Sequence, residues 1–241
     1  MAERLLDVVG LSKRFGGFTA LDAVSLHLGA RERLGLIGPN GSGKTTLINC
    51  ISGALMSDGG SVVFKGQDIT RLSAHQRVRR GITRSFQIPR PFRSMSVLEN
   101  LCVPLEYAGR ERRQRRRVED EAMAILELVG FQERAGESAA NLTQVDLRKL
   151  ELARALAAEP ALLVADEAMA GLSSAEVDDI LAILFRLNER GVAVIMIEHI
   201  MRAVMRFSER VVVLDAGQKI AEGTPDQVIS DPAVERAYLG E

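Results

Sequence analysis

The stretch Gly38-Pro-Asn-Gly-Ser-Gly-Lys-Thr-Thr46 decides the fold of this 241-residue chain. It reads G-x-x-x-x-G-K-T and stands between the apolar run 34–37 and a segment with apolar residues at helical spacing. Strand, glycine-rich loop, lysine and helix in this order are typical of a P-loop, which binds phosphate. The glycines let successive backbone N–H groups turn toward an anion, and the helix N-terminus adds favourable partial charge. A coincidental glycine turn is the alternative, which arises in about one chain of this length in a hundred.

This pattern predicts a role for each position of the loop. Lys44 contacts the β- and γ-phosphates of a nucleotide, and the hydroxyl of Thr45 is a ligand of Mg²⁺. The predicted nucleotide-binding residues are Gly38, Pro39, Asn40, Gly41, Ser42, Gly43, Lys44, Thr45 and Thr46.

The composition bounds the class of protein. With 26% charged and 46% hydrophobic residues, the chain is ordinary globular protein, long enough for one large α/β domain and a modest subdomain. A net charge of −1 gives no global attraction to nucleic acid, so no nucleic-acid partner is expected. Cys50 and Cys102 stand in no C-x-x-C pattern, which argues against a disulfide or zinc framework. Without a secretion signal or a run long enough to span a bilayer, we expect a soluble chain in a reducing compartment.

The apolar patterns divide the chain into a core and an insertion. Short strands over 5–11, 24–28 and 61–65 predict an antiparallel layer, followed by a helix over 74–80 and a strand over 82–86. Apolar runs at 161–165 and 192–197 are typical of strands covered on both faces, and a hairpin is expected around Ala216-Gly217. The predicted α/β core with its β subdomain spans 1–88 and 158–241.

Helical periodicity dominates the intervening segment, 89–157, which we interpret as a helical subdomain. Its candidate helices span 97–107 and 118–129, and a third carries Leu147, Leu150, Ala153 and Leu156 on one face.

Two carboxylates follow the apolar strand 162–165. Asp166 completes a Walker B pattern and is predicted to hold Mg²⁺ through water. Glu167 stands beside it as a natural general base for the attacking water. The alternative is a pair of solvated loop residues, but the P-loop upstream favours the catalytic interpretation.

His199 and Gln87 are weaker candidates. His199 ends an apolar run, from which it can touch a γ-phosphate, although alone it reads better as a cap of the next helix. Gln87 ends the strand 82–86 and is placed to ligate Mg²⁺ or to orient water, its alternative being a surface amide. His27 and His75 have no such context and are expected to be structural.

Taken together, these motifs resemble an ATP-binding-cassette (ABC) ATPase over essentially the whole chain. The resemblance implies a P-loop NTPase (RecA-like) α/β core with an antiparallel β subdomain and an inserted α-helical subdomain, and ATP and Mg²⁺ as cofactors. Gln87 matches the Q-loop glutamine, and His199 matches the switch histidine that senses the γ-phosphate. Phe15 matches the aromatic residue that stacks on adenine, the alternative being a core phenylalanine.

Several stretches look like the ATP-binding subunit of branched-chain amino acid importers: 14–22, 83–92, 198–201, 221–225 and 237–241. That resemblance implies a peripheral ATPase on the cytoplasmic face of the membrane. Its implied partners are transmembrane permease subunits, a second ABC ATPase subunit and, indirectly, an extracytoplasmic substrate-binding protein. A lipid or lipopolysaccharide exporter subunit, a soluble non-transport ABC ATPase and a nucleotide-gated regulatory module stay open as alternatives. The basic run 110–117 is interpreted as a solvated helix face, with contact to anionic lipid headgroups or nucleic acid as the alternative.

The chain departs from the family pattern at the signature, where Leu142-Thr-Gln-Val-Asp146 replaces Leu-Ser-Gly-Gly-Gln. In the family this segment contacts the γ-phosphate held by the partner subunit, which assigns Thr143 and Gln144 to nucleotide binding. Valine tolerates positive φ poorly, so we expect the signature loop either to adopt different dihedrals or to contact phosphate less closely, before a helix that begins near Leu147. Ala168 also replaces the usual proline after Walker B, and Ser173 replaces the usual aspartate of the D-loop. The intact P-loop and Glu167 beside the altered signature suggest a heterodimer with unequal ATP sites, and a homodimer stays open as the alternative.

Overall fold

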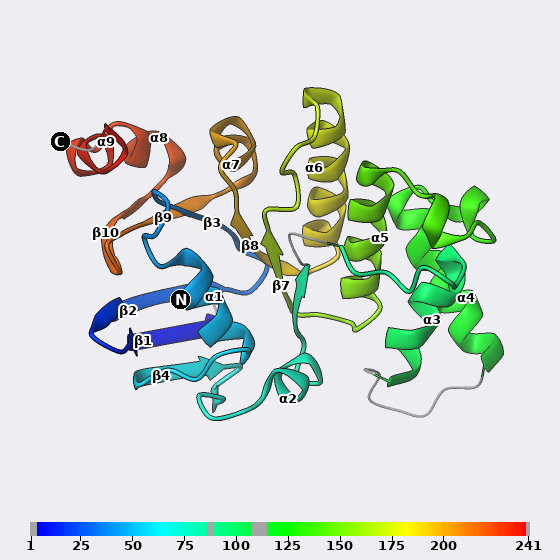
Figure 1. Cartoon of the computed structure of the whole chain (residues 1–241), viewed down its shortest axis with the longest axis horizontal. Coiled ribbons are helices and arrows are strands. Elements are labelled where there is room, and N and C mark those ends of the chain that lie inside the picture. The colour runs from blue at the N-terminus through cyan, green and yellow to red at the C-terminus, as the bar shows by residue number, and fades with distance from the viewer. Residues whose placement is uncertain (1–3, 86–88, 108–114, 240–241) are drawn as a thin grey trace.

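Two β-sheets and a group of helices make up the structure, a computed structural model that describes residues 4–85, 89–107 and 115–239 (Figure 1). The first sheet is antiparallel, in the order β2-β1-β4-β5. Its strands are β1 (Arg4–Phe15), β2 (Phe18–Gly29), β4 (Gly59–Phe64) and β5 (Gln67–Asp68). This sheet confirms the predicted antiparallel layer. β1 and β2 run further than predicted, because Gly16, at φ 58°, permits a two-residue turn that pairs Phe15 with Phe18.

The second sheet carries the P-loop, in the order β10-β9-β3-β8-β7-β6. Its strands are β3 (Arg33–Ile37), β6 (Ile82–Ser85), β7 (Leu162–Asp166), β8 (Ala193–Ile197), β9 (Arg210–Asp215) and β10 (Gln218–Gly223). All neighbours are parallel except β9 and β10, which form the expected hairpin around Ala216-Gly217. Because β3, β7 and β8 are adjacent and parallel, their carboxyl ends meet at one edge, where a ligand of an α/β sheet is expected.

The second sheet is covered on both faces, as its continuous apolar strands require. Along β7, Leu162 and Val164 point into the core shared with the first sheet and α1 (Lys44–Ser52). Leu163 and Ala165 point the other way, into the core beneath α6 (Ser174–Glu189) and α7 (Met201–Phe207). Figure 1 shows α1 between the two sheets, with α6 and α7 on the far face of the second sheet.

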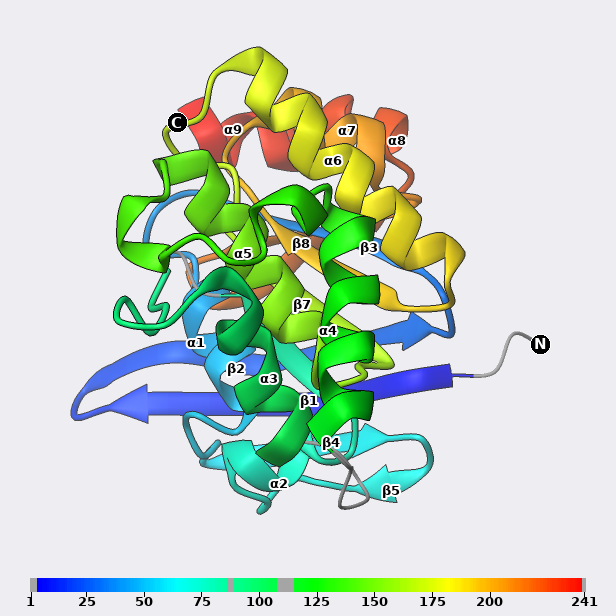
Figure 2. The same ribbon diagram turned by 90° about the vertical axis from the view of Figure 1, so that its right-hand side faces the viewer.

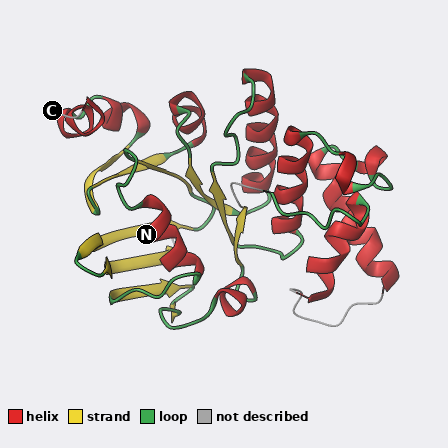
Figure 3. Cartoon of the chain, in the orientation of Figure 1, coloured by secondary structure: helices red, strands yellow, loops and turns green. Residues whose placement is uncertain are grey.

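The remaining helices include α3 (Val97–Tyr107), α4 (Arg115–Val129) and α5 (Gln144–Leu156), which gather beside β6 and β7 (Figure 2). Together with the 3-10 turns Gln132–Arg134 and Ala139–Asn141, they are the regular elements of the described part of 89–157 (Figure 3). α8 (Pro225–Ile229) and α9 (Pro232–Leu239) end the chain. In the described ranges no helix combines the length and apolar character that crossing a membrane needs.

A buried arginine holds the P-loop helix in place. Arg77, in α2 (Ala74–Val78), is 1% exposed and lies at the C-terminal end of α1. Its guanidinium donates to the carbonyl oxygens of Cys50 (2.6 Å), Ile51 (2.8 Å), Thr70 (2.8 Å) and Leu72 (3.0 Å). These carbonyls include the orphan acceptors at the helix end, where positive charge is also favourable. Arg77 thereby fixes the helix whose other end carries the P-loop.

Candidate nucleotide-binding site

The P-loop folds through glycines that no other residue could replace without movement. Gly43 has φ 102°, and a Cβ there would lie 2.7 Å from the carbonyl oxygen of Ala20. Gly38 has φ 148°, and its Cβ would lie 2.0 Å from the carbonyl oxygen of Leu214. Both positions therefore need glycine on conformational and steric grounds. The loop closes through Ser42, whose N–H donates to Pro39 at 3.2 Å and whose carbonyl accepts from Gly217 at 3.0 Å.

The helix after this loop begins without a cap. Gly43 occupies the N-cap of α1, and in the described part of the chain no side chain accepts a hydrogen bond from that turn. The first turn of α1 also holds no acidic residue. The N-terminal N–H groups and the positive end of the helix dipole are thus available to an external anion.

The Lys44 side chain is fixed by backbone carbonyls of the P-loop itself. Its Nζ donates to the carbonyl oxygens of Gly38 at 2.7 Å and Pro39 at 3.0 Å. Burial lowers the pKa of the Lys44 ammonium, and the carboxylates of Glu167 and Asp166 oppose that shift. Because the lysine is 7% exposed and donates to two neutral backbone carbonyls, an arriving phosphate would offer it a direct counter-charge.

Asp166 has a partner that sequence reasoning missed. Arg84, at the end of β6, donates from Nη2 to Oδ2 of Asp166 at 2.5 Å and from Nη1 to Oδ1 of Asn49 at 2.6 Å. The ion pair is nearly buried, with side chains 12% and 10% exposed. It fixes the orientation of the Asp166 carboxylate and ties β6 and β7 to α1. Within the described residues no side chain donates to Oδ1 of Asp166, which leaves that oxygen for another ligand.

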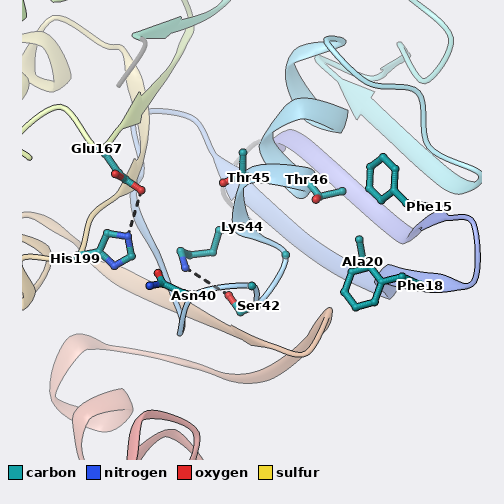
Figure 4. Close-up of a pocket in the computed structure, with 12 residues that line it drawn as sticks. Phe15, Phe18, Ala20, Asn40, Ser42, Lys44, Thr45, Thr46, Glu167 and His199 are labelled. Carbon is teal, nitrogen blue, oxygen red and sulfur yellow. Dashed lines mark hydrogen bonds and ion pairs between the residues drawn. The ribbon is translucent and has the colours of Figure 1, made fainter. Parts of the chain in front are cut away.

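Glu167 and His199 face each other across the carboxyl edge of the sheet (Figure 4). Nε2 of His199 lies 3.2 Å from Oε1 of Glu167. The backbone of Glu167 is left-handed, at φ 47°, and its N–H donates to the carbonyl oxygen of Ile197 at 2.9 Å. Non-glycine residues adopt this conformation rarely and mostly where the surroundings enforce it, often at functional sites.

Two aromatic rings border the other end of the pocket. Phe15 is 50% exposed and Phe18 is 63% exposed, each flanking the turn between β1 and β2. The pocket between these rings and the sheet edge is lined by Phe15, Phe18, Ala20, Asn40, Gly41, Ser42, Gly43, Lys44, Thr45, Thr46, Glu167 and His199 (Figure 4). Large apolar rings exposed beside a phosphate loop fit a planar base. The half-exposure of Phe15 disfavours its alternative as a core residue.

The structure therefore brings most of the predicted residues to one pocket. Gly38, Pro39 and Asp166 lie directly behind its lining, bonded to Lys44 or placed near it. Gln87 lies outside the described residues, so its predicted role is carried by sequence alone. Phe18, Arg84 and Asn49 were not predicted. Phe18 directly follows the glycine pair Gly16-Gly17, which could have indicated a turn that exposes it, whereas only the fold brings Arg84 and Asn49 together.

Thr143 and Gln144 lie away from this pocket, at the start of α5. α5 begins at Gln144, and neither Gln144 nor Val145 is among the residues with positive φ, so this segment avoids the backbone conformation that glycines would permit. The helix begins earlier than Leu147 because Thr143 and Asp146 form a capping box. Oγ1 of Thr143 donates to Oδ2 of Asp146 at 2.6 Å, and Nη1 of Arg134 lies 2.8 Å from the same oxygen.

The available donors suit a magnesium ion. The hydroxyl of Thr45 and the carboxylate of Asp166 are hard oxygen ligands on neighbouring elements. No cluster of three or more His, Cys, Asp or Glu capable of holding a metal occurs in the described ranges. Mg²⁺ does not require one, because it commonly binds through one or two carboxylates together with substrate phosphates and water. The residues present therefore fit Mg²⁺ that arrives with a nucleotide.

Comparison with known proteins identifies the relatives of this chain. A family model described as "ABC transporter" matches residues 21–170, which is more than half of the chain. A second model, "Branched-chain amino acid ATP-binding cassette transporter", matches residues 218–241. The chain is 39% identical to the high-affinity branched-chain amino acid transport ATP-binding protein LivG of Escherichia coli, with both chains covered completely. It is 37% identical to the lipopolysaccharide export system ATP-binding protein LptB of Haemophilus influenzae, with 98% of each chain covered.

A solved structure supports the same grouping. A nucleotide-free ATP-binding cassette from an ABC transporter superposes with a TM-score of 0.90 at 34% identity, covering 99% of this chain and all of the other. The two sheets and the helices described above are therefore the architecture of an ATP-binding cassette.

Proposed function

Because the chain belongs to the ABC transporter family of ATP-binding proteins, we propose that it hydrolyses ATP to drive transport through a separate permease. The observation that carries this proposal is the uncapped N-terminus of α1 beside Lys44, Glu167 and His199. It supplies both a phosphate-binding site and a carboxylate for water activation within one pocket.

Each residue has a role in this proposal. The backbone of 38–46 and the ammonium of Lys44 bind the phosphates, and Phe15 stacks on adenine. Thr45 and Asp166 hold Mg²⁺, with Gln87 as a further ligand, and the metal neutralises charge on the phosphates. Glu167 accepts a proton from the attacking water, and His199 contacts the γ-phosphate. Arg84 keeps the Asp166 carboxylate in one orientation through their ion pair.

The proposed cargo is a branched-chain or related amino acid, which the permease would recognise. Support comes from the 39% identity to LivG and from the match of residues 218–241 to the model named for branched-chain amino acid transporters. The identity to LptB, at 37%, keeps lipopolysaccharide export as the second candidate. We place the chain as a peripheral subunit on the cytoplasmic face of the membrane, where ATP and the permease are both accessible.

We further propose that its partner is a second, different ABC ATPase subunit. In a head-to-tail dimer, Thr143 and Gln144 would approach the ATP on the partner. Here Asp146 already occupies the hydroxyl and the N–H of Thr143, at 2.6 and 3.2 Å. A γ-phosphate at that end would meet a carboxylate, so the site completed by this signature is expected to turn over slowly. Restoring the family sequence with Thr143→Ser, Gln144→Gly, Val145→Gly and Asp146→Gln should raise the ATPase rate, and an unchanged rate would argue against this asymmetry.

The main test compares ATP hydrolysis and ATP binding by wild type and Glu167→Gln, each assembled with the permease. Loss of a general base lowers the rate by about 10²- to 10⁴-fold, whereas ATP binding should be retained because the P-loop is unchanged. Glu209→Gln, which removes an exposed carboxylate paired with Arg33, is the matched control and should leave both unchanged. Equal rates for wild type and Glu167→Gln would refute the proposed role.

A further inference from the structure

A buried carboxyl group beside the pocket has no part in the proposed chemistry. Glu198 directly follows β8 and precedes His199, and it is only 3% exposed. Glutamate is rarely buried to this extent unless it is paired or hydrogen bonded. Its contacts therefore indicate what the carboxyl group holds in place.

Glu198 binds the backbone that follows Glu167. Its Oε1 accepts the N–H of Met169 at 2.8 Å, in a buried contact between segments 29 residues apart. Met169 stands two residues after Glu167, whose own N–H donates to Ile197 of β8 at 2.9 Å. The end of β8 thus holds the left-handed turn at Glu167 on both sides, once through a strand carbonyl and once through the Glu198 side chain.

Charged groups from three elements surround Glu198. Arg148 of α5, itself 6% exposed, attracts the carboxylate, and Glu167 from the turn after β7 repels it. His199 follows in the same segment and contributes its backbone N–H. Burial raises the pKa of Glu198 to about 7, and Glu167 adds to the shift, while Met169, His199 and Arg148 oppose it. The carboxyl group therefore stands between the hydrolytic turn and the helix that begins at Gln144.

We propose that Glu198 is a positioning residue, which holds the left-handed backbone at Glu167 by accepting the N–H of Met169. The inference rests on the proposed role of Glu167 in hydrolysis. Without the hydrogen bond from Met169 to Glu198, which we call the clamp, the turn would relax toward ordinary dihedrals. Glu167 would then no longer face His199 in a fixed geometry. ATP binding would be little affected, because Glu198 is not among the residues that line the pocket.

The test uses full-length Glu198→Leu and Glu198→Gln, with Glu32→Gln as the control. Leucine removes the acceptor, whereas glutamine keeps an acceptor oxygen and removes the charge. Glu32 pairs with Arg210 in a partly buried ion pair whose residues do not line the pocket. The readouts are amide hydrogen exchange at Met169, ATP affinity, and the ATPase rate with the permease.

For Glu198→Leu we expect exchange at Met169 to rise at least about tenfold and the ATPase rate to fall about tenfold, with ATP affinity within about twofold of wild type. Glu198→Gln should keep most of the protection at neutral pH. After correction for intrinsic exchange, the wild type should lose protection relative to Glu198→Gln between pH 6 and pH 8. Opening the contact returns the carboxyl group to its ordinary pKa, so ionisation favours the open state.

Unchanged exchange at Met169 in Glu198→Leu would overturn the inference, as would ATP affinity that falls in step with the rate. If Glu198→Leu does not fold, the pH dependence of Glu198→Gln decides: a constant ratio of protection overturns the inference. Failure of the proposed function is a separate result, namely equal ATPase rates for wild type and Glu167→Gln. That result would not affect the exchange measurements at Met169, so the evidence for the hydrogen bond between Met169 and Glu198 would still stand.

Discussion

The helices α1 and α5 begin in opposite ways, although both N-termini belong to segments expected to meet phosphate. α1 follows Gly43, with no side-chain cap from the described residues and no acidic residue in its first turn. α5 follows Thr143, which forms a capping box with Asp146, and Arg134 pairs with the same carboxylate. Four uncompensated N–H groups attract an external anion, whereas a helix that carries its own anion has little need of another.

A helix N-terminus alone therefore does not define a phosphate site. α2, α5, α6 and α8 begin with a capping box, whereas α7, like α1, has no side-chain cap. What sets α1 apart is the glycine-rich loop before it and a buried lysine that donates to neutral carbonyls. Phosphate binding is therefore assigned to the α1 end, and a much weaker role to the α5 end.

The largest expected effect comes from Lys44→Ala, which removes the cation at the α1 end. Loss of a charge-assisted hydrogen bond to phosphate should weaken ATP binding by about 2–3 kcal/mol, or roughly 30- to 150-fold. Equilibrium binding of a fluorescent ATP analogue measures this directly. Lys219→Ala, which breaks a surface pair with Glu222, is the control and should bind normally. Similar affinity in both variants would remove the distinction between the two helix ends.

Glu198→Gln tests the buried carboxyl group beside the turn at Glu167. The raised pKa, about 7 against an ordinary 4.5, means that the folded wild type holds a proton that the unfolded chain has lost. Its stabilising contribution is complete below about pH 4.5 and is lost as the pH rises through about 7. From pH 5 to pH 8 the wild type should therefore lose about 1–3 kcal/mol relative to Glu198→Gln. Urea unfolding at both pH values measures this, and a constant difference would contradict the buried, proton-holding carboxyl group.

Phe15→Ala tests the end of the pocket that is expected to hold the adenine base. Removing an aromatic ring that stacks on a base weakens binding by about 1–3 kcal/mol, so ATP affinity should fall by about fivefold or more. Phe15→Trp should restore most of the affinity. Phe92→Ala, an exposed phenylalanine outside the pocket, is the control. If Phe18→Ala weakens ATP binding and Phe15→Ala does not, the adenine contact belongs to Phe18.

The smallest expected effect comes from Asp146→Ala, which opens the capped end. Loss of the capping interactions and of the pair with Arg134 should lower the free energy of unfolding by about 1 kcal/mol. It should also strengthen ATP-driven association with the second ATPase subunit. Glu176→Ala changes the equivalent position of the α6 capping box and is the control for helix stability. A gain in stability for Asp146→Ala, or no change in association, would contradict the self-capped description.

Much of this arrangement could be predicted because it is encoded locally. The P-loop, the strand that ends at Asp166 and the hairpin around Ala216-Gly217 each depend on residues adjacent in sequence. The parallel order of β3, β7 and β8 then follows from the family resemblance, and it brings Glu167 and His199 together. Phe15 and the P-loop could therefore be assigned to one pocket from local motifs and the family resemblance, without knowledge of long-range contacts.

The parts that escaped prediction depend on side chains far apart in sequence. Arg84 and Asp166 are 82 residues apart, and Glu198 and Met169 are 29 apart, so no spacing indicates either contact. The start of α5 was missed for a different reason. Thr143 and Asp146 were interpreted as remnants of a phosphate-binding signature, whereas the same two residues at this spacing form a helix cap.

The most direct test of the account measures ATP hydrolysis by the complete transporter with Glu167→Gln in this chain only. If hydrolysis occurs at the α1 end of this chain and the site completed by its α5 end contributes little, the rate should fall below about 5% of wild type. Two equivalent and independent sites would instead leave about half of the rate. A rate of half or more would contradict the central claim that the two ends have unequal roles.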